Sequence, residues 1–195
     1  MFWQQVHELD QQLTLAINSC YSAFTDPIWA FFSDKMVWIP MYAAIIALLF
    51  WKLGWKKTLI VLAGIGLTFG FCDQFSNIVT YAVARIRPVN DSFMLSQGLH
   101  VLETGGGYSF FSAHAANSFG LAASSVIGLR SYSGNPWWKT GYGAWMFFWA
   151  AMVSISRIFV GKHYLGDVIV GSIIGLAAGA AFGFLAYKVI CRYMK

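Results

Sequence analysis

The sequence contains little charge. Of its 195 residues only 11% are Asp, Glu, Lys or Arg, whereas 58% are hydrophobic and 18% are aromatic. The mean hydropathy is +0.59. Because soluble domains carry about 25% charged residues, this composition excludes an ordinary soluble domain and predicts an integral membrane protein.

Cysteine is also scarce. Cys20, Cys72 and Cys191 are odd in number and scattered through apolar sequence, which excludes a disulfide framework and the spacing of a metal site. No cluster of Asp, Glu and His suggests a metal, so we expect neither a metal nor a cofactor. The N-terminus lacks the basic region and apolar stretch of a signal peptide. Second domains, repeats and low-complexity tracts are not apparent.

Long hydrophobic runs dominate what remains. Each is near the roughly 20 residues that a membrane-spanning helix needs. The runs cover residues 36–51, 58–84, 113–129, 140–157 and 165–187. Before them, apolar side chains from Val6 to Ile17 recur at helical spacing opposite glutamines, which predicts an amphipathic helix in the membrane interface. We therefore expect an all-α membrane protein with an interfacial segment, 1–25, and a membrane domain of about five spanning helices, 26–195.

The charge distribution predicts an orientation. Eight cations lie in two of the loops and in the C-terminal tail, with no acidic residue among them: Lys52, Lys56, Lys57, Arg130, Lys139, Lys188, Arg192 and Lys195. The positive-inside rule places these segments, with the C-terminus, in the cytoplasm. The loop 85–112 then faces the periplasm or the exterior. The net charge of +5 therefore reflects membrane orientation, and we expect no nucleic-acid partner.

Polar residues converge on the outer side at three span ends. In "SRIFVGKHYLGD", His163 and Asp167 are four residues apart, so on a helix the carboxylate can accept a hydrogen bond from one imidazole nitrogen. That bond leaves the other nitrogen free as a base, ligand or nucleophile. Arg87 and Arg157 present planar donor forks that suit phosphate. Together these residues predict a site for an anion at the membrane surface.

Each feature also has a structural interpretation. A His-x3-Asp pair alone is more often structural, and arginines at span ends commonly anchor to lipid headgroups. The glycines at 105–107 suggest a flexible turn. The series Gly171, Gly175, Gly179 and Gly183 indicates close helix packing, because small residues four apart let helices approach. The functional interpretation is favoured because the charged groups occupy three span ends on one side.

The sequence resembles the type 2 phosphatidic acid phosphatase family of membrane lipid phosphatases, which carries the motifs K-x6-RP, PSGH and SR-x5-H-x3-D. The third motif is complete in Ser156, Arg157, His163 and Asp167. The second retains Ser112 and His114, with Phe111 and Ala113 in place of Pro and Gly. The first retains Arg87-Pro88, but Thr80 occupies the lysine position.

The resemblance implies a lipid-phosphatase helical bundle and a metal-independent reaction. His163 would attack phosphorus to form a phosphohistidine, Asp167 would orient its ring, and His114 would act as the general acid. The phosphate-binding residues would be Arg85, Arg87, Ser112, Ala113 and Arg157. Arg85 or Lys162 would replace the cation missing at Thr80. Asp73 and Asn77 could support the first motif, or Asp73 could be a structural acid.

The expected substrate is a lipid phosphate or diphosphate of the outer leaflet, in contact with membrane lipids, and a bacterial inner membrane is the expected location. The candidates are undecaprenyl diphosphate, a lipid A phosphate and phosphatidylglycerol phosphate. We expect undecaprenyl diphosphate, because four nearby cations could balance its charge and the loop 91–108 is short for a large saccharide. A haloperoxidase is disfavoured by the long apolar spans. A different class, an inactive transporter or scaffold, would explain the altered motif positions as decay.

Overall fold

The protein is a bundle of helices, as the sequence predicts. The computed structural model describes residues 2–194, and within them every regular element is helical, apart from one isolated bridge between Ile86 and Tyr108. The α-helices are α1 (Phe2–Asn18), α2 (Asp26–Ser33), α3 (Ile39–Val83), α4 (Ser92–Ser96), α5 (Ala113–Gly128), α6 (Pro136–Phe159) and α7 (Leu165–Tyr193). Short 3-10 turns are η1 (Lys35–Trp38), η2 (Pro88–Asn90) and η3 (Leu129–Ser131).

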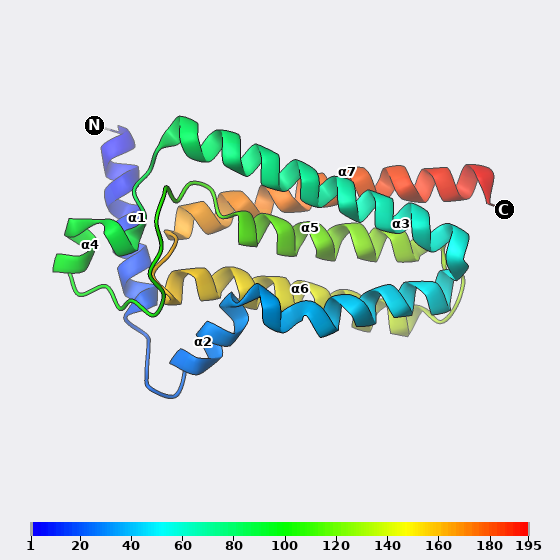
Figure 1. Cartoon of the computed structure of the whole chain (residues 1–195), viewed down its shortest axis with the longest axis horizontal. Coiled ribbons are helices and arrows are strands. Elements are labelled where there is room, and N and C mark those ends of the chain that lie inside the picture. The colour runs from blue at the N-terminus through cyan, green and yellow to red at the C-terminus, as the bar shows by residue number, and fades with distance from the viewer. Residues whose placement is uncertain (1, 195) are drawn as a thin grey trace.

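Helices α3, α5, α6 and α7 lie along the long axis of the molecule, while α1, α2 and α4 gather at one end (Figure 1). Helix α3 folds back on itself at Gly54, whose φ of 72° is readily adopted by glycine. The first two predicted spans are therefore the two limbs of α3. Two stretches, Lys35–Val83 and Leu165–Tyr193, are long and apolar enough to cross a membrane. The number of spanning helices remains a prediction.

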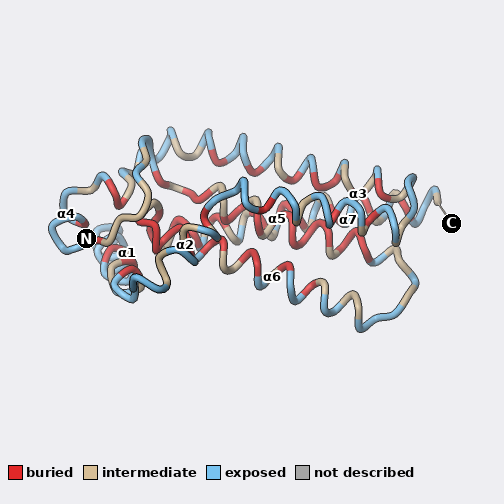
Figure 2. Tube along the Cα trace, turned by 60° about the horizontal axis from the view of Figure 1, so that its bottom comes forward, coloured by how far each residue is buried: buried red, intermediate tan, exposed pale blue. Residues whose placement is uncertain are grey.

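Helices α5 and α7 make the closest contact in the bundle. A Cβ atom added at Gly175 would lie 2.1 Å from the carbonyl oxygen of Ala116, and one at Gly179 would lie 2.4 Å from that of Gly120. The glycine series is thus a packing surface, as the sequence indicated. Buried residues accordingly concentrate along this pair of helices (Figure 2). This contact sets how the first residues of α5 lie against the first residues of α7.

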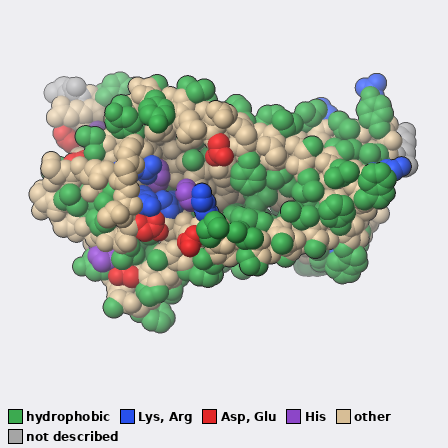
Figure 3. Space-filling model, viewed as in Figure 1, with side chains coloured by type: hydrophobic (Ala, Val, Ile, Leu, Met, Phe, Trp, Pro, Cys, Tyr) green, Lys and Arg blue, Asp and Glu red, His purple; other side chains and the backbone are tan. Residues whose placement is uncertain are grey.

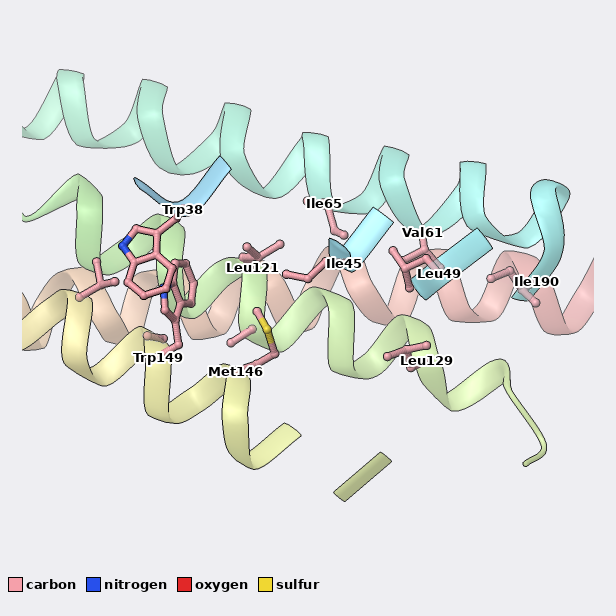
Figure 4. Packing of buried hydrophobic residues seen from close by; sticks show 13 residues of the cluster. Trp38, Ile45, Leu49, Val61, Ile65, Leu121, Leu129, Met146, Trp149 and Ile190 are labelled. Carbon is pink, nitrogen blue, oxygen red and sulfur yellow. The ribbon is translucent and has the colours of Figure 1, made fainter. Parts of the chain in front are cut away.

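A hydrophobic core fills the space between α3, α5 and α6. Leu49 and Val61 from the two limbs of α3 meet Leu121, Met146 and Trp149 (Figure 4). Large apolar side chains also cover the outer surface of the bundle; examples are Trp51, Leu59, Ile78, Phe148 and Ile173. An apolar surface of this extent is unfavourable in water and typical of a membrane contact. The protein is therefore an integral membrane protein.

Helix α1 lies across the end of the bundle with its polar side turned inward. Thr14 and Asn18 are buried, whereas Trp3 and Leu9 are exposed. The Thr14 hydroxyl accepts a hydrogen bond from the backbone N–H of Leu165 at 3.0 Å. Asp10 Oδ1 accepts one from Gly166 at 2.7 Å. Side chains of α1 thus satisfy the free N–H groups of the first turn of α7, and the apolar side of α1 is left facing outward.

The close contact between α5 and α7 can be tested by adding one methyl group. Gly175→Ala should lower the melting temperature in detergent, because the Cβ must displace the backbone at Ala116; overpacking typically costs about 1–3 kcal/mol. Gly70→Ala on α3 is the control, because nothing lies within 4 Å of its Cβ position. Thermal unfolding monitored by circular dichroism measures both variants. Equal melting temperatures would show that the helices separate without cost.

Candidate active site

A cavity of about 370 Å³ opens at the end of the bundle where α1, α2 and α4 gather. It lies between the end of α3, the loop 84–112, the start of α5 and the turn from α6 to α7. Its wall includes Thr80, Arg87, His114, Arg157, Lys162 and His163. Figure 3 shows basic and histidine side chains together in a hollow at this end, with the apolar surface beyond them. The three sequence motifs therefore meet in one place.

His163 presents one ring nitrogen to this cavity. Its Nδ1 lies 2.9 Å from the carbonyl oxygen of Ser109 and must donate to it. Its Nε2 lies 3.1 Å from a guanidinium nitrogen of Arg87 and therefore acts as the acceptor. Asp167 lies farther away, with Oδ2 3.6 Å from Nδ1. Ser109 thus selects the tautomer, while Asp167 supplies negative charge behind the ring.

The environment keeps His163 neutral at physiological pH. Burial lowers its pKa from 6.5 to about 4. The nearby carboxylate of Asp167 acts in the opposite direction, and the charges of Arg157 and Arg87 lower the pKa further. A neutral ring whose Nε2 carries no proton is the form that a nucleophile or base requires.

Two arginines flank the histidine. Arg87 donates from Nε to the carbonyl oxygen of Gly106 at 3.0 Å, so the glycine loop holds the guanidinium in place. Arg157 is buried and donates to the carbonyl oxygen and the hydroxyl of Ser33 on α2. Both side chains line the cavity. Positioned guanidinium groups of this kind suit the oxygens of a phosphate group.

Lys162, one of the two cations expected to replace the motif lysine, lines the cavity. Thr80 lines the cavity, but its hydroxyl donates to the carbonyl oxygen of Phe110 at 2.8 Å. Lys162 lines the same cavity, and its Nζ lies 2.6 Å from Glu103. Burial raises the pKa of Glu103, but hydrogen bonds from Lys162 and Ser33 and the charge of Arg157 hold it below 4.5. Glu103 therefore places a negative charge beside the cations that an incoming anion must contact.

Arg85 is not among the residues that line this cavity. One guanidinium nitrogen lies 2.8 Å from Asp10 of α1, and the other lies 2.8 Å from Oδ1 of Asp167. The guanidinium also stacks on the ring of Tyr164, 3.6 Å from its centroid. Arg85 is thus directed at the carboxylate behind His163. The RP motif marks Arg87 alone, but nothing in the sequence shows which partner Arg85 contacts.

Ser112 also differs from the expectation. Its side chain is fully buried and accepts a hydrogen bond from the N–H of Ala115 at 3.4 Å. Its hydroxyl therefore caps α5 and does not form part of the cavity wall, whereas Ala113 and His114 do. The backbone N–H of Ser112 donates to the carbonyl oxygen of Asp167 at 3.1 Å. Ser112 thus ties the start of α5 to the start of α7.

The protonation state of His163 can be measured directly. In a pH titration of the histidine 13Cε1 resonances in detergent, the signal missing from His163→Gln should titrate near pH 4. Arg87→Gln should move that midpoint upward, because the charge of Arg87 lowers the pKa of His163. A wild-type midpoint at or above the ordinary value of 6.5 would contradict the proposed environment.

Comparison with known proteins agrees with the motifs. The family model described as PAP2 superfamily matches residues 57–190. The chain is 36% identical over 188 residues to a lipid A 4'-phosphatase of Bacteroides thetaiotaomicron, covering 95% of this chain and 80% of that protein. It is 28% identical over 190 residues to a lipid A 4'-phosphatase of Porphyromonas gingivalis, covering 95% and 75%.

Solved structures share the fold. A PAP2 type phosphatidylglycerolphosphate phosphatase from Bacillus subtilis superposes with a TM-score of 0.71 at 19% identity, covering 98% of this chain and 89% of that one. Aquifex aeolicus LpxE superposes with a TM-score of 0.63 at 21% identity, covering 91% and 93%. The family match over most of the chain agrees with the three motifs that meet in the cavity. The chain therefore belongs to the PAP2 superfamily and is a membrane lipid phosphatase.

Proposed function

We propose that this protein removes a phosphate monoester from lipid A or a closely related glucosamine-based lipid. The observation that carries the proposal is the similarity, over 95% of the chain, to two lipid A 4'-phosphatases. The motif residues that such a reaction needs lie around one cavity. Nothing among these relatives supports undecaprenyl diphosphate, so the lipid A alternative replaces it.

The charges around the cavity also favour a phosphate monoester over the expected diphosphate. That expectation counted Arg85, Arg87, Arg157 and Lys162 as free cations. Arg85 is paired with two carboxylates, and Lys162 is paired with Glu103. The remaining positive charge matches one phosphate monoester better than the larger charge of a diphosphate.

The first chemical step follows from the placement of the histidines. Nε2 of His163 forms a bond to phosphorus as the bond from phosphorus to the lipid oxygen breaks. His114 gives that oxygen a proton, so the lipid leaves as a neutral alcohol. Arg87 and Arg157 bind the phosphoryl oxygens, where the transition state carries its charge.

The second step returns the enzyme to its starting state. The phosphorylated ring carries positive charge, which Asp167 stabilises from behind. His114, now neutral, takes a proton from water as the water attacks phosphorus. Inorganic phosphate is released and His163 is again neutral. Every proton in this cycle passes between water, His114 and the lipid oxygen, so the residues present suffice for the reaction.

We further propose that the site faces the periplasm of a bacterial inner membrane and that the C-terminus is cytoplasmic. The turn at Gly54 carries Lys56 and Lys57, and it lies against Tyr193 near the C-terminus. This end is opposite the site (Figure 1). Clustered lysines at the end remote from the cavity support a cytoplasmic location for that end.

Topology reporters test this orientation. A phosphatase fused after Met194 should be inactive in cells, whereas a fluorescent protein fused there should be bright. A cysteine introduced at Ser96 should react with a membrane-impermeant maleimide in intact spheroplasts, with Gln97→Cys as a second position in the same turn. Labelling only after lysis would place the site in the cytoplasm.

The two histidines should have separable effects on turnover. Phosphate release from lipid A by purified protein should be abolished in His163→Ala. His114→Ala should lose about 10²- to 10⁴-fold, as expected for a general acid, but should lose much less with p-nitrophenyl phosphate, whose leaving group needs no proton. Full activity of His163→Ala would exclude the covalent mechanism. Absence of phosphate release by the wild-type protein would favour the scaffold alternative.

Arg85 and Lys162 should differ in which kinetic parameter they change. Arg85→Ala should lower kcat for lipid A by about 10- to 100-fold with little change in KM, the loss typical when a partner that orients a functional histidine is removed. Lys162→Ala should chiefly raise KM, because it removes a cation from the cavity wall. Arg85→Lys, which keeps the charge, should recover part of kcat. A raised KM in Arg85→Ala would instead support direct phosphate binding.

A further inference from the structure

A second cavity of about 420 Å³, here called the side chamber, adjoins the catalytic cavity. Ala113 and His114 line both cavities. The side chamber lies between η1, the two limbs of α3, α5 and α6. Most of its wall is apolar, with Phe32, Trp38, Phe69 and Trp149 among its residues. Lys35, Asp73 and Asn117 are the notable exceptions on this wall.

Asp73 and Asn117 form a pair across α3 and α5. The amide nitrogen of Asn117 donates to Oδ1 of Asp73 at 2.7 Å. Within residues 2–194 Asp73 makes no ion pair closer than 4.0 Å, and its side chain remains exposed. A carboxyl group among the apolar residues of a membrane helix is costly, and such residues are commonly functional. The mechanism described above does not use Asp73.

Asp73 and Asn117 lie near His114, the proposed general acid, and therefore near the proposed position of the leaving group. His114 and Asn117 are three residues apart on α5, so they share one face, separated by about 4.5 Å along the axis. His163, Arg87 and Lys162 line the first cavity, so in the proposed mechanism the phosphorus lies on that side of His114. The oxygen that receives the proton of His114 therefore lies at the junction of the two cavities. The rest of the leaving group extends into the side chamber and meets the pair first.

We propose that Asp73 and Asn117 form a subsite that binds hydroxyl or amide groups of the sugar bearing the phosphate. The proposal rests on the proposed function and names the part of the substrate that the chamber recognises. The free carboxylate oxygen of Asp73 accepts from a sugar O–H or N–H, and the apolar wall contacts the acyl chains. A site built to hydrogen-bond a substrate discriminates strongly against analogues that lack the group. A diacylglycerol phosphate has no such group beside its phosphate.

Two substrates and two variants test the subsite. Lipid A supplies the sugar, and phosphatidic acid supplies a phosphate monoester without one. Asp73→Leu should lower kcat/KM for lipid A by about 10- to 100-fold, the range for a lost hydrogen bond to a charged group, and leave phosphatidic acid within about threefold. Gln74→Leu is the control, because this neighbour on α3 is exposed and lines neither cavity.

The outcomes separate a binding role from a structural one. If the pair merely joins α3 to α5, Asp73→Leu will lower kcat/KM for both substrates equally and will lower the melting temperature, and the subsite is excluded. Unchanged hydrolysis of lipid A by Asp73→Leu also excludes the subsite, while the proposed function stands. Hydrolysis of phosphatidic acid but not lipid A by the wild-type protein overturns the proposed function itself, and the subsite with it.

Discussion

The buried carboxylate of Asp167 is the interaction on which the organisation of the active end depends. A buried charge is costly unless it is paired and hydrogen-bonded. Asp167 accepts hydrogen bonds from Arg85 and from the backbone of Tyr164, and it lies behind the ring of His163. Its carbonyl oxygen accepts from Ser112 at the start of α5. One residue thus connects the loop after α3, helix α5 and the catalytic histidine.

Helix α1 belongs to the same network, although it lies before all three family motifs in the sequence. Asp10 binds both Arg85 and the first turn of α7. The polar side of α1 therefore faces inward, because its hydrogen-bond and ion-pair partners in α7 and Arg85 lie there. Its apolar side, which includes Trp3 and Leu9, is largely exposed, as expected of an interfacial helix. One short helix thus combines an exposed apolar side with direct contacts to the candidate site.

The four long helices, α3, α5, α6 and α7, form an apolar shaft, and the polar side chains gather at the end that holds the cavity. This division sets where the candidate site residues lie. Along the shaft, glycines of α7 let backbones approach closely, so α5 and α7 present His114 and Asp167 in a fixed relation. At the polar end, charged groups are neutralised largely by one another. Glu103 with Lys162 and Asp10 with Arg85 are examples. Arg157 also lies 3.9 Å from Glu103, so several cations at this end face a carboxylate.

The sequence by itself determined the membrane class, the long helices and which residues are candidates for the site. Apolar runs of spanning length leave few alternatives to helices. His163 does lie near Asp167, 3.6 Å away, but it precedes the first residue of α7, so the approach comes from the turn before the helix and not from helical spacing. Motif order identified the family. The break in α3 at Gly54 was also foreseen as the boundary between two runs, because lysines interrupt the apolar sequence there.

Only the tertiary structure decided which groups contact and orient these residues. Arg85 reaches Asp167 across 82 positions in the chain, and Asp10 reaches Gly166 across 156; contacts at such separations leave no periodic signal. Ser109 acts through a backbone carbonyl, which every residue possesses and no sequence pattern marks. Arg85 and Arg87 are chemically identical and two residues apart, yet they point to different partners. Their direction is set by the irregular loop that carries them, because no helical or strand periodicity constrains side chains there.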